Sequence, residues 1–180
     1  HLFGVDEPGR VSLLGRDGLG RDVFSRLLHG GRVSLVTGLL ATLLAIGIGA
    51  FAGTISGYFG GSIDSILMRL SELFMSLPWL YLLLAIRALL PLSITPTQTF
   101  LLLVALLGVV GWAHPARLIR GLVLSVRHEP YIDAARGMGV PTFQILLRHV
   151  LPQTGSVVLT QAAILIPQYV LAEVTLTFLG

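Results

Sequence analysis

Long apolar runs alternate with shorter polar segments along this chain. No charged residue occurs between Arg32 and Asp64. A helix that crosses the hydrocarbon core of a bilayer needs about 20 mostly apolar residues, so we expect a first span at about 33–57. Three further spans are expected at about 73–90, 97–113 and 155–177. The second run reaches spanning length only if the long side chain of Arg87 extends to the membrane interface.

Two polar segments complete this organisation. Residues 1–32 are rich in glycine and arginine and precede the first span, and residues 114–153 form an insertion between the third and fourth spans. The pattern predicts an all-α fold, a polytopic membrane bundle of about four spans over residues 33–180. The chain begins without a methionine and stops at Gly180 directly after an apolar run, so we expect a fragment of a longer protein.

The insertion contains the signals of two short helices separated by a bend. Pro130 suits the first turn of a helix, and Gly139 suits the residue after its last turn. Pro141 forces the residue before it into an extended conformation and opens a second helix, whose apolar pattern fits a position along the membrane surface. Ala134 and Ala135 leave one face of the first helix without bulk. We therefore expect that face to fit closely into the groove of a partner.

Four glycines, Gly49, Gly53, Gly57 and Gly61, recur at every fourth position. This spacing clears one face of a helix, so that another helix can approach closely. The neighbouring helix belongs either to the same subunit or to a partner subunit, and the sequence leaves both readings open. Gly61 is expected at the edge of the following loop.

One acidic residue, Glu173, stands inside the last apolar run. A charge at that depth is costly and usually faces a cavity or a partner. Glu173 is therefore a candidate for a transport pathway, although a place near the outer membrane interface would explain it equally well. Pro167, six residues earlier in the same run, is expected to kink the span.

The composition supports a membrane protein. Hydrophobic residues make up 54% of the chain and charged residues 12%, whereas soluble domains have about 25% charged residues. The mean hydropathy is +0.85. The net charge of +3 arises from arginines scattered at the ends of apolar segments, which form no basic stripe. We therefore expect anchoring in a lipid bilayer and no binding of nucleic acid.

Several kinds of chemistry are excluded by the residue types. The chain has no cysteine, so it has neither disulfides nor a cysteine-based metal site. All twelve basic residues are arginines, and a P-loop needs a lysine to reach the nucleotide phosphates. Any use of ATP must therefore belong to another polypeptide. His114, His128 and His149 match no metal-ligand spacing, and the serines show no activated-nucleophile setting, so no catalytic residue, metal or cofactor is expected on this chain.

A motif runs through the insertion. It consists of Asp133-Ala134-Ala135, then Gly139, and then His149-x-Leu151-Pro152. This spacing resembles the EAA loop of ABC importer permeases. Asp133 stands where the family has glutamate, and it keeps the charge on a shorter side chain. A histidine at the position of His149 resembles the motif of the dipeptide, oligopeptide and nickel branch of these permeases.

Other stretches carry the same resemblance. Residues 14–35, LGRDGLGRDVFSRLLHGGRVSL, resemble the segment before the second span of such permeases, although Arg16 replaces the usual threonine. The stretches GYFGGSIDSILMR, GWAHPARLIRG and LAEVTLTFLG are also similar to the family. The likeness thus covers nearly the whole chain.

The resemblance implies a permease subunit of a bacterial ATP-driven ABC importer, in the cytoplasmic (inner) membrane. Such a subunit has about six spans, of which this chain would hold four. The implied partners are two cytoplasmic ATPase subunits that bind ATP and Mg²⁺, a second homologous permease and an extracytoplasmic solute-binding protein. The implied solute is a peptide, nickel or a related small solute.

The resemblance also implies how the chain is used. ATPase closure would reach the spans through the loop 133–152 and drive alternating access. The residues assigned to this coupling are Tyr131, Asp133, Ala134, Ala135, Gly139, His149, Leu151 and Pro152. The opening segment and Arg87 would lie outside, and residues 58–72 and 114–153 inside. Arginines are equally numerous on the two sides, so the positive-inside rule does not decide this orientation.

Two other classes of function stay open. An ion-gradient-driven secondary transporter or channel would suit a kinked helix and an intramembrane acid, as Pro167 and Glu173 allow. Such a carrier has no need to present the loop 133–152 to an ATPase. A membrane-embedded hydrolase is the other alternative, and the absence of a nucleophile, base or metal-ligand set counts against it.

Overall fold

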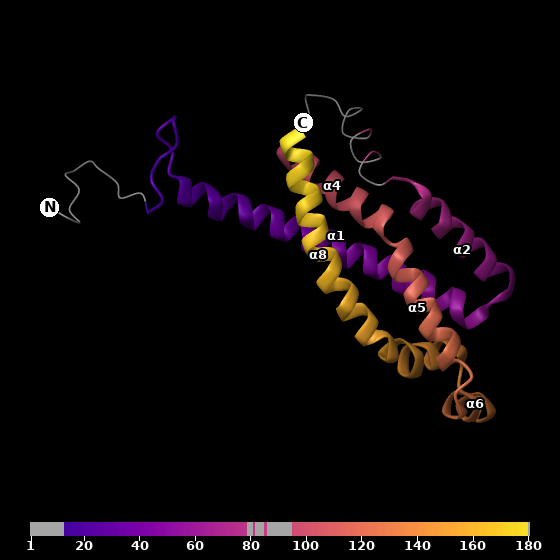
Figure 1. The fold of residues 1–180 in the computed structure, drawn as a ribbon. Helices are drawn as coiled ribbons and strands as arrows, with labels where there is room; N and C mark the ends of the chain where they lie inside the picture. Colours follow the sequence, from indigo (N-terminus) through magenta and orange to yellow (C-terminus); the bar gives the residue numbers. More distant parts are fainter. Residues whose placement is uncertain (1–12, 79–80, 82–84, 86–94, 180) are drawn as a thin grey trace.

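Figure 1 shows the fold in a computed structural model that describes residues 13–78, 81, 85 and 95–179. Within those residues every regular element is helical, apart from an isolated β-bridge between Arg16 and Asp22. The all-α polytopic fold expected from the sequence is confirmed. Three described helical stretches are long and apolar enough to cross a membrane: Val23–Phe59, Thr97–Val126 and Thr142–Leu176. The span expected at about 73–90 lies mostly outside the described residues.

The first helix, α1 (Val23–Phe59), begins earlier than expected. The Asp22 carboxylate accepts hydrogen bonds from the Ser25 backbone N–H at 3.2 Å and from the Ser25 hydroxyl at 2.5 Å, which caps the helix N-terminus. The helix thus starts before the span expected at about 33–57, because Arg32 is an exposed residue within the helix and does not end it. A 37-residue helix is about 55 Å long, which exceeds the roughly 30 Å hydrocarbon core.

A tight turn joins α1 to α2 (Gly61–Ser76). Gly60 and Gly61 both have positive φ, +67° and +59°, a conformation that glycine adopts without a steric penalty. The loop expected at residues 58–72 is thus helical from Gly61 onward. Figure 1 shows α2 running back alongside α5.

The third expected span continues far beyond its expected end. Helix α4 (Pro96–Gly111) begins with a capping box between Thr95 and Gln98. Trp112 then joins it to α5 (Ala113–Val126). The first part of the expected polar insertion is thus a helix that packs along α1.

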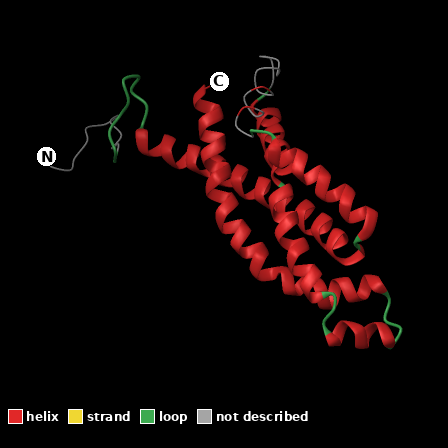
Figure 2. Cartoon of the chain, turned by 45° about the vertical axis from the view of Figure 1, so that its right-hand side comes forward, coloured by secondary structure: helices red, strands yellow, loops and turns green. Residues whose placement is uncertain are grey.

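The rest of the insertion has the predicted order of helix, bend and helix. Helix α6 (Pro130–Gly137) is followed by Gly139, whose φ of +78° makes the bend, and by α7 (Thr142–Ile145). A π-helical turn, η1 (Leu146–Val150), and a 3-10 turn, η2 (Leu151–Thr154), connect α7 to α8 (Gly155–Leu179). Figure 2 shows this stretch turning across the end of the bundle beside α6.

The helix bundle is organised around α1, which packs against α5, α4 and α8. The three glycines that face α5 are Gly49, Gly53 and Gly57. A Cβ on Gly53 would lie 3.1 Å from the Arg120 backbone nitrogen and nearer still to the Ala116 carbonyl oxygen. The stripe thus packs within this subunit. Gly61 lies in the turn with open space around it and is not part of the stripe.

We expect Gly53→Ala to destabilise the protein, because a single methyl group at this position forces the α1 and α5 backbones apart. Overpacking of a well-packed interior typically costs about 1–3 kcal/mol. The matched control is Gly47→Ala, on the same helix with nothing within 4 Å of the added methyl. Thermal melting in detergent should give a lower Tm for Gly53→Ala only. Equal Tm values for the two variants would contradict the close approach.

Candidate functional site

Helix α6 stands at one end of the bundle, apart from the long helices (Figure 1). Pro130 occupies its first turn, where the missing backbone N–H is not needed. Asp133 lies in its first turn and Arg136 in its last, an arrangement that the helix dipole favours. The Met138 N–H donates to the Ala134 carbonyl oxygen at 3.0 Å, and the chain then turns at Gly139.

One face of α6 is buried in a small core. Ile132 and Ala135 are 0% and 3% exposed. They belong to a cluster of buried residues from α5, α6, α7 and η1: Ile119, Val123, Ile132, Ala135, Ile145 and Val150. Because this cluster is apolar and fully buried, α6 is held against the bundle by the hydrophobic effect and is not a loose surface loop.

The expectation that Ala134 and Ala135 form one bare face is wrong. Successive helical residues point about 100° apart, so burial of Ala135 in the core leaves only Ala134 exposed. Tyr131 and Ala134 lie on the exposed side of α6, and Met138, the C-cap residue directly after the helix, follows them at the spacing i, i+3 and i+7. Tyr131 is 42% exposed and Met138 is 76% exposed. We call these three residues the α6 outer face. Met138 was missed in the sequence, although its spacing from Tyr131 would have identified it.

Polar contacts connect α6 to the end of α1. The Arg136 guanidinium donates to the Asp133 carboxylate at 3.1 Å and to the Tyr58 hydroxyl at 3.3 Å. The same guanidinium lies 5.1 Å from the centre of the Tyr58 ring, which adds a cation–π interaction. Arg127, just after α5, donates to the Gly57 carbonyl oxygen at 3.0 Å and so satisfies the C-terminal end of α1. Arg136 and Arg127 thus link α6 and the end of α5 to the last turn of α1.

A second ion pair joins α2 to α5 near the same end of the bundle. Arg120 binds the Asp64 carboxylate through Nε and Nη2, both at 2.5 Å, and the Ser56 hydroxyl also donates to Asp64. The hydrogen bond from Arg120 is the main reason that the pKa of Asp64 lies below its ordinary value of 3.8. A lowered pKa means that the pair stabilises the fold above pH 3.8 and loses this effect as the pH falls through the lowered value.

The residues at the end of the motif, His149, Leu151 and Pro152, do not lie together: His149 is beside Tyr131, and Leu151 lines an apolar groove. The His149 ring, in η1, lies 6.3 Å from the Tyr131 ring, so these two residues come together. Leu151 instead lines an apolar groove of about 600 Å³, together with Phe51 and Phe143. Pro152 occupies the first turn of η2 and is exposed.

Glu173 is not near α6. It is 9% exposed on α8, and its Oε2 accepts a hydrogen bond from the Ser34 hydroxyl of α1 at 2.6 Å. The bond contributes to the packing of α8 on α1. Among the described residues, no group of three or more histidine or acidic side chains is placed to hold a metal ion.

The family comparison gives this arrangement its context. The model of the family described as "Binding-protein-dependent transport system inner membrane component" matches residues 45–180. The chain belongs to this family. The match includes the α1 glycines, α6 and the motif up to Pro152, so the whole candidate site lies within it.

Curated relatives of this transport family have similar sequences over most or all of the chain. The chain is 37% identical over 180 residues to a dipeptide transport system permease protein of Bacillus subtilis, covering 100% of this chain and 51% of the relative. Oligopeptide transport system permease proteins of Haemophilus influenzae and Escherichia coli K12 are 36% and 38% identical over 92% of this chain. These matches cover 51% and 53% of those relatives. The chain thus spans about half the length of these relatives.

We expect Gly139→Val to destabilise the bend after α6. A left-handed backbone costs an L-residue about 1–2 kcal/mol, and a β-branched side chain is among the least tolerated there. Gly137→Val is the matched control, because Gly137 has ordinary helical φ and nothing within 4 Å of an added Cβ. Hydrogen exchange of the α6 and α7 amides should accelerate in Gly139→Val more than in the control. Equal protection in both variants would contradict the role of this glycine.

We also expect Asp64→Asn to lower stability at neutral pH by on the order of 1–3 kcal/mol, because it leaves Arg120 partly buried without its counter-ion. Glu72→Gln is the control on the same pair of helices. Its 2.7 Å ion pair with Arg117 is more exposed, and such pairs contribute about 0–1 kcal/mol. Denaturation should separate the two variants at pH 7, and the effect of Asp64→Asn should shrink below pH 3.8. Equal losses at both positions would show that burial does not distinguish these pairs.

Proposed function

We propose that the complete protein is the permease subunit of a bacterial ATP-driven importer of peptides in the cytoplasmic membrane. The family match and the names of the relatives support this reading. Two cytoplasmic ATPase subunits bind ATP and Mg²⁺, a second homologous permease completes the membrane channel, and an extracytoplasmic solute-binding protein delivers the peptide. Nickel, which the sequence resemblance also allows, is not in the names of the relatives described above.

The α6 outer face is the observation that carries the proposed coupling. Tyr131, Ala134 and Met138 present two apolar groups around one small residue, on a helix whose opposite face is fixed in the core. Methionine adapts well to a partner's groove, because its side chain is unbranched and flexible. We therefore assign this face to the contact with an ATPase subunit.

Movement then passes inward along two routes. The buried cluster connects α6 to α5 and η1, so these elements move with α6 as one packed unit. Arg136 and Arg127 connect the same region to Tyr58 and Gly57 at the end of α1. When the ATPases close on ATP, displacement of α6 tilts α1 and α5 together, which is the motion that alternating access requires of the spans.

The remaining predicted residues take supporting roles in this proposal. Asp133 orients Arg136 through their 3.1 Å ion pair, and His149 lies beside Tyr131 at the edge of the outer face. Leu151 and Pro152 fix the junction between η1 and α8. Gly49, Gly53 and Gly57 keep α1 and α5 together, so that a second permease would meet other surfaces of α1. Glu173 would face the pathway only if the bond to Ser34 opened during transport.

The outer face gives a direct test of the proposal. In the complete transporter, Ala134→Trp should leave the fold intact, since the side chain points away from the core, and should exclude the docked ATPase. ATP-dependent peptide uptake into proteoliposomes should fall at least tenfold, a change worth about 1.4 kcal/mol. Ser125→Trp, at another exposed position, is the control and should transport normally. Crosslinking between Ala134→Cys and cysteines in the ATPase groove should be efficient in the otherwise native complex.

The same vesicles distinguish the alternatives. ATP-dependent uptake that survives dissipation of all ion gradients agrees with the proposed importer. Uptake that stops with an ionophore and continues without ATP would replace it with a gradient-driven carrier. Normal uptake by Ala134→Trp together with no crosslink would remove α6 from the ATPase contact.

A further inference from the structure

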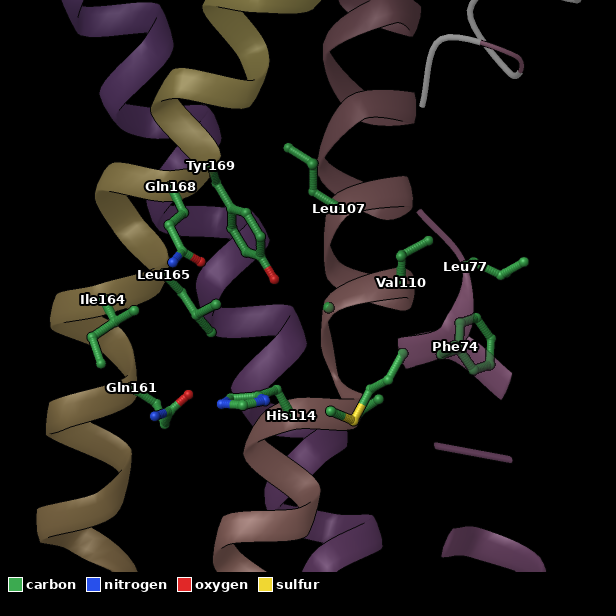
Figure 3. Close-up of a pocket in the computed structure, with 13 residues that line it drawn as sticks. Phe74, Leu77, Leu107, Val110, His114, Gln161, Ile164, Leu165, Gln168 and Tyr169 are labelled. Atoms are coloured by element: carbon green, nitrogen blue, oxygen red, sulfur yellow. The ribbon is translucent and has the colours of Figure 1, made fainter. Parts of the chain in front are cut away.

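A pocket of about 360 Å³ lies between α2, the α4–α5 junction and α8 (Figure 3). Most of its lining is apolar. The polar exceptions are His114 from α5 and Gln161, Gln168 and Tyr169 from α8. Figure 3 shows His114 and Gln161 pointing toward one another across the space between their helices. The pocket is separate from α6 and from the apolar groove beside Leu151.

Two buried polar atoms in this lining have no hydrogen-bond partner among the described residues. They are Gln161 Oε1 and the Tyr169 hydroxyl. Both side chains are only 5% exposed. A buried polar group without a partner is unfavourable, and native proteins satisfy nearly all of them. Both atoms are enclosed in this conformation, so a ligand that supplies the missing partners reaches them only after α8 moves away from α4.

The backbone around Tyr169 is shaped to hold its hydroxyl. The hydroxyl oxygen occupies the space that a Cβ at position 111 would fill, so Gly111 is the residue that makes this position available. Gly111 is the last residue of α4, immediately before the junction at Trp112. The tyrosine ring, which packs in the core with Leu107 and Leu165, is therefore fixed with its polar end at the helix junction.

The two unpartnered groups are complementary to a peptide backbone. Gln161 Oε1 accepts a hydrogen bond, and the Tyr169 hydroxyl can donate one, whereas each peptide unit offers one N–H and one C=O. At a rise of about 1.5 Å per residue, the two positions are about 12 Å apart along α8. An extended peptide covers that distance in about three to four residues.

The absence of charged side chains among the lining residues further restricts the chemical class of the ligand. The thirteen lining residues include no carboxylate, guanidinium or ammonium group. They offer one imidazole and no thiolate or carboxylate, a poor donor set for a transition-metal cation such as nickel. The lining therefore favours a neutral amide backbone over a charged terminus or a metal ion.

We propose that this pocket is an intramembrane subsite for the backbone of the peptide in transit, with Gln161 and Tyr169 as its hydrogen-bonding residues. The inference rests on the proposed import of peptides and adds the part of the solute that this chain recognises. Because backbone groups are common to all peptides, such a subsite accepts many side chains. Movement of α8 relative to α4 during alternating access exposes the two groups to the solute.

The test uses Tyr169→Phe and Gln161→Met in the complete transporter, with a radiolabelled tetra-alanine peptide and saturating binding protein in proteoliposomes. Each variant keeps the size of its side chain and removes the polar atom. Loss of one hydrogen bond should raise the apparent KM for uptake roughly threefold to tenfold. Tyr81→Phe, at a tyrosine that is 71% exposed, is the control and should behave as wild type.

Thermal melting separates this role from a structural one. Removing a buried hydroxyl that has no partner in the protein should leave the Tm of Tyr169→Phe unchanged or raised. Weaker uptake with an unchanged or higher Tm supports the subsite. Unchanged uptake in both variants, or a fall in uptake that only follows a fall in Tm, overturns it. If the wild-type transporter shows no ATP-dependent uptake of any peptide, the proposed function itself fails, and the subsite fails with it.

Discussion

The close approach of α1 and α5 is the constraint on which the rest of this structure depends. At Gly53 the backbones meet so tightly that a single methyl group has no room. This spacing brings Arg120 within reach of Asp64 and Arg127 within reach of the last carbonyl groups of α1. It also places the end of α5 so that Ile119 and Val123 pack against α6. The close contact between α1 and α5 thus determines where the α6 outer face lies.

Much of the fold was readable from the sequence because it follows from local chemistry. The apolar run after Arg32, the proline at the start of α6 and the glycine at the bend each specify one local conformation. The boundaries of α1 and α5 were not readable, since a span inside the bilayer and its helical extension outside it have the same backbone. Charges mark where the membrane ends, and they do not mark where the helix ends.

The candidate site shows a different limit. The sequence located α6 correctly, but it gives no reason to treat the two adjacent alanines differently. Only the position of the core shows which of them is buried. Ala135 is buried because α5 and η1 converge on it, a contact between segments that are distant along the chain. The pairing of Arg136 with Tyr58 has the same origin. The polar pocket beside α8 was also not predicted, because His114 and Gly111 come from a segment that is distant along the chain from Gln161 and Tyr169.

The contact between Gly111 and Tyr169 has a consequence for how this chain can evolve. The tyrosine hydroxyl fills the volume that any larger residue at position 111 would need, so the two positions share one space. A substitution to alanine at 111 is compatible with the packing only if residue 169 becomes shorter or turns away. Whether a substitution is tolerated at position 111 therefore depends on the residue at position 169, and the reverse also holds. In a lineage that loses the glycine, the loss of the tyrosine hydroxyl should accompany it, and the two changes should be inherited as a pair.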